Sequence, residues 1–456
     1  MLESINPATE EPIQTYPEHS AAELDEIVRR AEQTFQSWKK VPIAERAYLL
    51  RKAAEVLLKN VEHYAECITR EMGKPITQSR AEVEKCATNC TYFADHAEQF
   101  LQAEQVATEA RKSYIAFEPL GVVLAIMPWN FPFWQVFRCA APILAAGNTL
   151  MLKHAPTTTG CALAVQEVFR EAGFPEGAYQ TLLISAPNVP ERISTLIEHP
   201  SVKAVTLTGS TNAGKFVAAK AGAALKKSVL ELGGSDPYLI LEDANLELAV
   251  ETCVSSRCIN TGQSCIAAKR FIVVEKVRKE FEEAFVEKMR AKRIGNPLGD
   301  VDLGPLARND LRHTLHRQVE ASVSKGAKLL LGGVYPEGRG FFYPPTVLSG
   351  ISKGMPAYHE ELFGPVAAII AAKNEAEAIA LANDTCYGLG AAIFTSDLER
   401  GERIAREIEA GNCFINAMVR SDPRLPFGGI KNSGYGRELS RIGMHEFVNV
   451  KTVFVR

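Results

Sequence analysis

The sequence predicts an α/β protein built on parallel β-sheets, and three observations lead to that prediction. With 456 residues, the chain is too long for one ordinary hydrophobic core, so at least two domains are expected. Its 46% hydrophobic and 23% charged residues are typical of a globular protein. From Gly121 onward, short apolar runs alternate with helix-length amphipathic segments. Such alternation implies right-handed βαβ crossovers and helices on both faces of a sheet.

The first hundred residues have the apolar periodicity of helices. Helices are predicted at 21–39, 44–58 and 77–101. Ser20 is suited to cap the first of them, and Cys86 and Cys90 lie four apart, as on a core-facing stripe. We expect these helices to provide packing rather than chemistry.

A first parallel sheet is predicted after residue 120. Its strands are expected at 122–127, 149–152, 179–184, 204–208 and 227–230. Helices are expected after Pro132, at 157–172, up to about 198, and at 211–221. Parallel sheets bind ligands at the carboxyl ends of their strands, so functional residues are sought there.

A second alternating region runs from about Pro237 to Phe427, with strands such as 270–274 and 367–370. The segment 447–455 (FVNVKTVFV) has the period of an exposed strand, and 113–117 forms another short extended piece. Free strand edges invite pairing with a second chain.

The bulk composition excludes several classes of function. A net charge of −3 argues against binding nucleic acid or an anionic membrane surface. The N-terminus lacks a secretory signal, and no apolar run is long enough to span a membrane. Ten cysteines show no disulfide or zinc framework, so no metal site is expected. The reducing cytoplasm is the expected location.

The most informative segment is NTGQSCIAAKR (260–270), where Cys265 follows a small, polar turn containing glycine. Gly262 lets the backbone approach a bound molecule closely. A reachable thiolate can act as a nucleophile, although a lone cysteine is more often a small buried hydrophobe. LELGG (230–234) adds a carboxylate, Glu231, beside a glycine pair.

MPWNFP (127–132) adds an amide, Asn130, after the first strand of the parallel sheet. Pro132 suits the first turn of a helix, so Asn130 lies just before a positive dipole end, where it can stabilise an oxyanion. Asn130 alone is equally compatible with simple helix capping. Trp129 and Trp134, two of the three tryptophans, suggest a wall that contacts a ligand.

Three further segments carry weaker signals. TGSTNAG (208–214) is a strand-to-helix turn that favours an anion, but it is not a GxGxxG fingerprint. LKHAP (152–156) places Lys153 at the same sheet edge, within reach of ribose hydroxyls or a phosphate. ELFGP (361–365) holds a glutamate and a phenylalanine in a glycine-bounded loop. A plain turn, a solvated lysine and a capping glutamate are the simpler alternatives.

Together these segments resemble the NAD(P)-dependent aldehyde dehydrogenase superfamily over nearly the whole chain. The resemblance rests, in order, on PWNFP, the lysine after the next strand, TGS, ELGG, GQSC, ELFGP and PFGGIKNSGYGRE (426–438). It implies a Rossmann-like parallel-sheet cofactor domain, an α/β catalytic domain and a small β oligomerisation arm. The implied ranges are 1–231 for the cofactor domain, with 103–118 contributing to the arm, 232–427 for catalysis, and 428–456 for the C-terminal return and oligomerisation strand.

The resemblance also assigns roles residue by residue. Cys265 matches the nucleophile, Glu231 the general base, and Asn130 with the Cys265 backbone N–H the oxyanion hole. The implied reaction is oxidation of an aldehyde through a thiohemiacetal and a thioester on Cys265. The expected cofactor contacts are Ile126, Met127, Trp129, Lys153, His154, Pro156, Gly209, Ser210, Leu232, Gly233, Glu361 and Phe363.

The cofactor preference follows from one position. Relatives that are strict for NAD usually have a glutamate three residues after the matching lysine, where this chain has Pro156. The missing carboxylate removes repulsion against a 2′-phosphate. NADP is therefore expected to be preferred, with NAD also used.

The substrate expectation rests on Trp134, Arg138 and Ser421. Trp134 and Arg138 are four apart and share a helix face, and an arginine can grip a carboxylate with paired N–H groups. The succinate semialdehyde dehydrogenases have an arginine eight residues after the oxyanion asparagine, as Arg138 is, and a serine matching Ser421. A second arginine of some members is replaced by Ile259, and Arg257 or Arg424 is the candidate substitute.

Alternative functions remain open at this point. A dehydrogenase for another small aliphatic or carboxylated aldehyde is the alternative to the succinate semialdehyde interpretation. Acylating relatives do not use a glutamate in the ELGG position, so Glu231 favours hydrolysis. A non-catalytic structural relative, as in lens crystallins, predicts a damaged site, whereas Cys265, Glu231 and Asn130 are intact. The terminal strand and 103–118 resemble oligomerisation arms, which predicts a homodimer or homotetramer.

Overall fold

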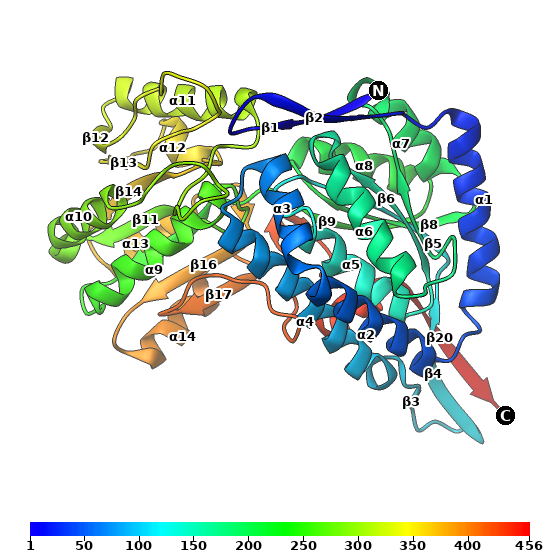
Figure 1. The fold of residues 1–456 in the computed structure, drawn as a ribbon. Coiled ribbons are helices and arrows are strands. Elements are labelled where there is room, and N and C mark those ends of the chain that lie inside the picture. Colours follow the sequence, from blue (N-terminus) through cyan, green and yellow to red (C-terminus); the bar gives the residue numbers. More distant parts are fainter.

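Two large sheets with helical cover form the body of the molecule, and a small third sheet extends from it with the C-terminus (Figure 1). The computed structural model describes residues 1–456. No helix in it combines the length and apolar character needed to cross a bilayer.

The N-terminal part is helical, as predicted. A β-hairpin that was not predicted precedes the helices. The hairpin consists of β1 (Leu2–Asn6) and β2 (Glu11–Tyr16), and the helices are α1 (Ala21–Trp38), α2 (Ile43–Lys59), α3 (Val61–Met72) and α4 (Ile76–Leu101). Ser20 and Glu23 form a capping box at α1. Cys86 and Cys90 are fully buried, so the predicted core stripe is confirmed. Helix α3 was missed.

The first large sheet has the order β19-β9-β8-β5-β6-β7. Its strands are β5 (Val122–Met127), β6 (Thr149–His154), β7 (Tyr179–Leu182), β8 (Val202–Thr208), β9 (Lys227–Glu231) and β19 (Gly434–Tyr435). Its helices are α5 (Trp134–Ala145), α6 (Thr159–Glu171), α7 (Val189–Glu198) and α8 (Thr211–Ala223), and the 3-10 turns are η1 (Pro156–Thr158) and η2 (Ala186–Asn188). The strands β5 to β9 pair in parallel, which confirms the predicted sheet. β19 returns from the C-terminal segment and pairs antiparallel with β9.

The second large sheet has the order β12-β13-β14-β11-β10-β16-β17 and is parallel except for β12. Its strands are β10 (Asp236–Ile240), β11 (Ala268–Val274), β12 (Lys328–Leu331), β13 (Thr346–Ser349), β14 (Val366–Ala372), β16 (Gly390–Phe394) and β17 (Asn412–Ile415). Its helices are α9 (Leu246–Cys258), α10 (Glu275–Arg290), α11 (Asn309–Ser324), α12 (Pro356–His359), α13 (Glu375–Asn383) and α14 (Leu398–Glu407).

The third sheet joins distant parts of the chain. It consists of β20 (Val448–Val455), β4 (Lys112–Pro119) and β3 (Glu104–Gln105), and β20 follows α15 (Ser440–His445). A short ladder of β15 (Tyr387–Gly388) and β18 (Ile430–Lys431) connects the C-terminal segment to the second sheet region.

The strand ends that matter for function meet at one edge of the first sheet. Met127 lies beside His154, and Ile126 lies between Lys153 and Leu207. Glu231 pairs with Thr208 on one side and with Gly434 on the other. Because parallel strands present their carboxyl ends together, these motifs share one edge although they are far apart in sequence.

Candidate active site

The loop that carries Cys265 has an unusual backbone. After α9, the turn η3 (Ile259–Gly262) places Asn260 and Thr261 in the left-handed region, with φ of 52° and 54°. Such conformations cost roughly 1–3 kcal/mol each and persist only where the surroundings fix them. The Asn260 side-chain amide fixes this turn by donating to the Asn130 carbonyl at 2.7 Å and the Gln263 carbonyl at 3.1 Å.

The backbone of Gly262 lies close to another loop of the protein. Its φ is +77°, and a Cβ on it would stand 2.3 Å from the backbone of Gly364. The close approach is therefore to the ELFGP loop, and not to a bound molecule as the sequence suggested. The glycine holds the nucleophile loop against the loop of Glu361 and Phe363.

Cys265 is half-buried and lines a cavity of about 440 Å³. The other lining residues are Lys85, Phe131, Trp134, Gln135, Arg138, Ser256, Ile259, Ser264, Ile266, Met418, Val419, Arg420, Ser421, Asp422, Pro423, Arg424 and Phe427. Burial raises the pKa of the Cys265 thiol to about 12, against the opposing charges of Arg138 and Lys269. The sulfur is therefore protonated at neutral pH and must lose a proton to react.

Two amide donors lie beside this thiol. The Cys265 backbone N–H makes no hydrogen bond within the protein. The Asn130 side-chain amide donates to the Gln263 carbonyl at 3.1 Å, which holds it against the same loop. One N–H of that amide remains free, because an amide carries two.

Asn130 does not cap a helix. Helix α5 begins at Trp134 with Phe133 as its N-cap, so Pro132 is not in its first turn and that prediction was wrong. Glu82 accepts the backbone N–H groups of Phe133 and Trp134 at 2.9 Å each. The buried Glu82 carboxylate, which is paired with Lys74, thus occupies the positive end of the dipole.

Glu231 ends β9 in a buried position, and neither carboxylate oxygen has a hydrogen-bond partner. Burial, followed by the charge of Glu438, raises its pKa well above the ordinary glutamate value, and Arg138 opposes this rise. The side chain does not line the 440 Å³ cavity. A raised pKa means that this carboxylate, once ionised, binds a proton more strongly than an ordinary glutamate does.

Arg138 differs from its expected role. It lines the cavity with Trp134, but its guanidinium is buried and paired with Glu438. It also donates to Thr208 Oγ1 at 3.0 Å. This arginine is therefore not a free cation that could grip a substrate carboxylate, and the sequence expectation needs correction.

The two substitute arginines also differ from expectation. Arg257 is fully buried and donates to the Gly262 carbonyl at 2.6 Å, so it supports the nucleophile loop and does not line the cavity. Arg424 lines the cavity but binds Asp422 through two contacts of 2.8 and 2.6 Å. Ser421 lines the cavity, and its hydroxyl accepts a hydrogen bond from Lys85 at 2.8 Å.

The expected cofactor contacts gather at the edge of the first sheet. Lys153 is 7% exposed and has no carboxylate or hydrogen-bond partner, and burial lowers its pKa to about 8. Gly209 and Ser210 are partly exposed where α8 begins, and Ser210 Oγ caps that helix. An unpaired lysine at the same sheet edge as a helix N-terminus suits ribose hydroxyls and phosphates. Pro156 begins η1, so no carboxylate stands at that position.

Two further expected cofactor contacts, Glu361 and Phe363, come from the loop before β14 of the second sheet. Trp129 meets Phe363 edge to face, with ring centroids 5.8 Å apart. Glu361 accepts the Gly234 N–H at 3.0 Å and lies 3.5 Å from Lys269. A Cβ on Gly233 would stand 2.6 Å from this carboxylate. Residues of both domains thus surround the sheet edge on which Glu231 and Lys153 stand.

Three apolar or aromatic positions in this set have structural roles. The His154 ring is buried, with its nitrogens at 3.0 Å from the Pro132 carbonyl and 2.9 Å from Thr158 Oγ1. Burial lowers its pKa to about 4, so this neutral ring is not available to a cofactor, contrary to expectation. Leu232 is buried against Gly214, and Met127 is 2% exposed.

Sequence reasoning missed Lys85 and Glu438 as site residues. Glu438 stands at the end of PFGGIKNSGYGRE, so that segment already held the signal. Lys85 lies in the helical stretch taken as packing, and nothing in its local sequence marks it.

Comparison with known proteins agrees with this geometry. A family model described as "Aldehyde dehydrogenase family" matches residues 1–453. A Synechocystis protein named "Probable succinate-semialdehyde dehydrogenase (NADP(+))" is 50% identical, covering 100% of this chain and 99% of its own. The Escherichia coli "Succinate semialdehyde dehydrogenase (NAD(P)+) Sad" is 49% identical, with coverage of 99% and 97%. The Streptococcus pyogenes succinic semialdehyde dehydrogenase, solved with NADP+, superimposes with a TM-score of 0.97 at 37% identity and full coverage of both chains.

Proposed function

The chain belongs to the aldehyde dehydrogenase family, and we propose that it oxidises succinate semialdehyde to succinate with NADP+, and less efficiently with NAD+. The observation that carries the proposal is the charge of the cavity at Cys265. Four cationic side chains line it, and two of them are paired, Arg138 with Glu438 and Arg424 with Asp422. Lys85 and Arg420 make no ion pair, so the cavity keeps a positive charge. A cavity of this kind suits an aldehyde that carries a carboxylate. The relatives named for this substrate support the same assignment.

We propose that Cys265 and Asn130 perform the first chemical step. The thiol gives its proton to water, the sulfur bonds to the aldehyde carbon, and the electrons of the C=O π bond move to the oxygen. The resulting oxyanion accepts hydrogen bonds from the Cys265 backbone N–H and the Asn130 amide. The backbone N–H makes no other hydrogen bond, and the Asn130 amide keeps one N–H beside the one it donates to the Gln263 carbonyl. When bound, the nicotinamide accepts the hydride from this carbon.

Glu231 performs the second step in this proposal. It takes a proton from water, which attacks the thioester on Cys265 and releases the acid. The buried, unpartnered carboxylate supports this role, although it must reach the thioester from outside the cavity lining.

The cofactor residues fit a dinucleotide with a 2′-phosphate. Lys153 is an unpaired, buried cation at the sheet edge, and Pro156 places no negative charge beside it. Gly209 and Ser210 offer a partly exposed helix start for phosphate, and Trp129, Glu361 and Phe363 close the site from the other side. A reducing compartment such as the cytoplasm suits a free nucleophilic thiol.

We also propose that the chain forms a homodimer or homotetramer through the third sheet. β20 lies at a sheet edge and exposes Val450 and Phe454 at 59% and 52%. An exposed apolar edge strand is a template for pairing with another chain. Light scattering of the purified protein tests this, and a monomer would contradict it.

The function is tested with a panel of aldehydes and both cofactors. Steady-state NADPH or NADH formation is measured for succinate semialdehyde, shorter and longer dicarboxylic semialdehydes, and butanal. We expect the highest kcat/KM for succinate semialdehyde with NADP+. A higher kcat/KM for butanal would overturn the substrate proposal, and a higher value with NAD+ would overturn the cofactor preference.

A further inference from the structure

The cavity at Cys265 contains one half-buried cation without an anionic partner, the ammonium of Lys85. We infer that Lys85 is the residue that binds the substrate carboxylate, in place of the arginine that the sequence suggested. This inference rests on the proposed function and assigns its substrate specificity to a residue of α4.

The ammonium is held in place by neutral contacts. Lys85 Nζ donates to Ser421 Oγ at 2.8 Å and lies 4.1 Å from the centre of the Trp134 ring. An ammonium has three N–H donors, and the bond to Ser421 uses one of them. The aromatic ring attracts the positive charge through its face and offers no lone pair as a hydrogen-bond acceptor. The charge is thus oriented by two neighbours and left free to meet a carboxylate.

The other cations of the cavity are less available. Arg138 is paired with Glu438, and Arg424 is paired with Asp422. Arg420 is exposed to solvent, where a charge attracts weakly. Lys85 makes no ion pair within 4.0 Å, and its burial strengthens any interaction with an anion.

The charge on Lys85 also depends on pH within a useful range. Burial, followed by the charge of Arg138, lowers its pKa to about 8, and Cys86, Glu82 and Asp422 act in the opposite direction. Below this pKa the ammonium is charged and can hold a carboxylate, and above it the charge is lost. The KM for succinate semialdehyde is therefore expected to rise as the pH rises through about 8.

The test compares Lys85→Met, Lys85→Arg and wild type on succinate semialdehyde and butanal. Methionine keeps an unbranched stem without the charge, and we expect it to raise KM for succinate semialdehyde about ten- to a hundredfold more than KM for butanal, the range for losing one hydrogen bond to a charged group. Arginine should recover much of the loss and remove the pH dependence, because its charge persists above pH 8. Arg80→Met is the matched control, since Arg80 lies on the same helix and pairs with Glu62 at the surface.

The possible results separate this inference from the proposed function. If wild type shows no preference for succinate semialdehyde, the proposed function fails. If wild type shows that preference and Lys85→Met keeps it, the assignment of Lys85 is wrong. If Lys85→Met does not fold, Lys85→Gln, which retains a donor for Ser421, gives the same comparison.

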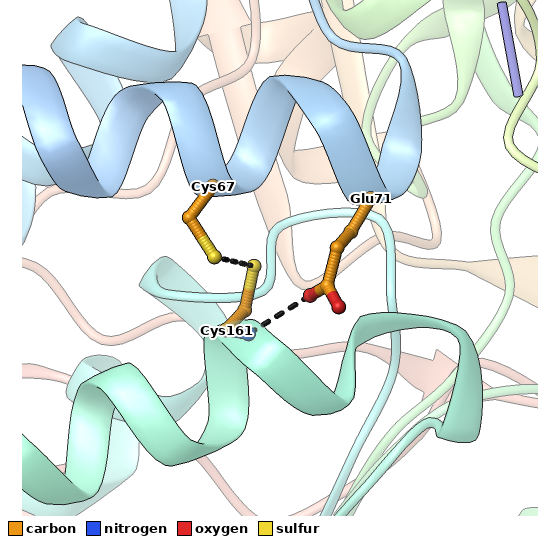
Figure 2. A group of neighbouring side chains, drawn as sticks. All are labelled: Cys67, Glu71 and Cys161. Atoms are coloured by element: carbon orange, nitrogen blue, oxygen red, sulfur yellow. Dashed lines mark hydrogen bonds between the residues drawn. The ribbon is translucent and has the colours of Figure 1, made fainter. Parts of the chain in front are cut away.

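A separate observation concerns two cysteines remote from this cavity. Cys67 of α3 and Cys161 in the first turn of α6 face each other with their sulfur atoms 3.6 Å apart (Figure 2). We propose that this pair is a dithiol that peroxide oxidises to an intrachain disulfide. Closing the gap to the S–S bond length of about 2.05 Å requires a shift of roughly 1.5 Å.

The surroundings favour a disulfide over a metal site. Glu71 also lies at the cluster, but one carboxylate oxygen accepts the backbone N–H of Cys161 at 2.8 Å (Figure 2). The other accepts the backbone N–H of Gly160 at 2.9 Å. That carboxylate is committed to the start of α6, which leaves two sulfurs where a structural zinc needs four ligands. The same two bonds hold Cys161 in position opposite Cys67.

The difference in exposure sets the order of the chemistry. Cys67 is half-buried and Cys161 is fully buried, so peroxide reaches Cys67 first. The Cys67 sulfur bonds to one peroxide oxygen, the O–O bond breaks, and a sulfenic acid and water result. The Cys161 sulfur then bonds to the Cys67 sulfur, the S–O bond breaks, and a second water leaves, so two thiols are oxidised and one peroxide is reduced.

The experiment uses the full chain with Cys265→Ser, which removes the reactive thiol of the cavity. The protein is treated with hydrogen peroxide, alkylated, and digested without reduction for mass spectrometry. We expect a peptide pair joined through Cys67 and Cys161, which is lost when Cys67→Ser is added. Conversion of Cys67 to a sulfinic acid while Cys161 is alkylated, or alkylation of both thiols, would overturn the proposal.

Discussion

Arg138 and Glu438 form a buried ion pair that borders the Cys265 cavity and acts on the pKa of Glu231. Arg138 extends from α5, and Glu438 comes from the C-terminal segment that pairs with β9. The charge of Glu438 contributes to the raised pKa of Glu231, while Arg138 lowers the pKa of Cys265 and Glu231. The pair therefore influences the pKa of both Cys265 and Glu231, and it does not present a free cation to the substrate.

Replacing Cys265 tests the covalent step. Cys265→Ser should lower kcat/KM for aldehyde oxidation by at least about a thousandfold, because a serine hydroxyl is far less nucleophilic than a thiolate. The melting temperature should change little, since the side chain is only half-buried. Cys386→Ser, at an exposed cysteine, is the control, and full turnover by Cys265→Ser would contradict the mechanism.

Replacing Glu231 tests the hydrolytic step. Glu231→Gln should leave a rapid burst of NADPH, followed by a steady state at least about a hundredfold slower, because a general base contributes about that much or more. Stopped-flow absorbance separates the two phases. If the burst were slowed as much as the steady state, Glu231 would instead be needed at a step before hydride transfer.

The pH profile of that step follows from the raised pKa of Glu231. Only the ionised carboxylate accepts a proton, and the raised pKa keeps the group protonated to a higher pH than an ordinary glutamate. The steady-state rate should therefore increase with pH until the pKa of Glu231 is passed. A flat profile in wild type, identical to that of Glu231→Gln, would argue against this base.

Breaking the Arg138–Glu438 pair should affect stability and both substrates alike. Arg138→Met leaves a buried carboxylate without its partner, which should cost about 3–5 kcal/mol of unfolding free energy in urea. The double variant Arg138→Met/Glu438→Leu should recover much of that loss. A selective rise in KM for succinate semialdehyde, with butanal unaffected, would restore the substrate role first inferred from sequence.

Position 156 should control the choice of cofactor. Pro156→Glu places a carboxylate near the expected 2′-phosphate, and like charges at that range cost several kcal/mol. KM for NADP+ should rise at least about tenfold relative to KM for NAD+. Pro156→Gln introduces a side chain of similar size without the charge and should leave the ratio of the two KM values nearly unchanged. If both variants gave the same ratio, the 2′-phosphate would bind elsewhere.

Local sequence patterns were sufficient for much of the fold. The strand at 122–127 was predicted with its observed bounds, and the four other predicted strands of the first sheet differ by a few residues, because apolar periodicity is a local property. β19 of the same sheet was not predicted. The helix α3 was missed although its buried residues Tyr64, Ile68 and Met72 have helical spacing. The start of α5 was misplaced because Glu82, from another helix, binds its first N–H groups.

The sequence by itself determined the family resemblance, the strand order along the chain and the candidate nucleophile, since each depends on residues that are close in sequence. Only the tertiary structure decided which charges are free. Ser421 receives its hydrogen bond from Lys85, 336 positions away, and Arg138 meets Glu438 from the far end of the chain. An ion pair cancels a charge that the sequence shows as available, and such partners become neighbours only when the chain has folded.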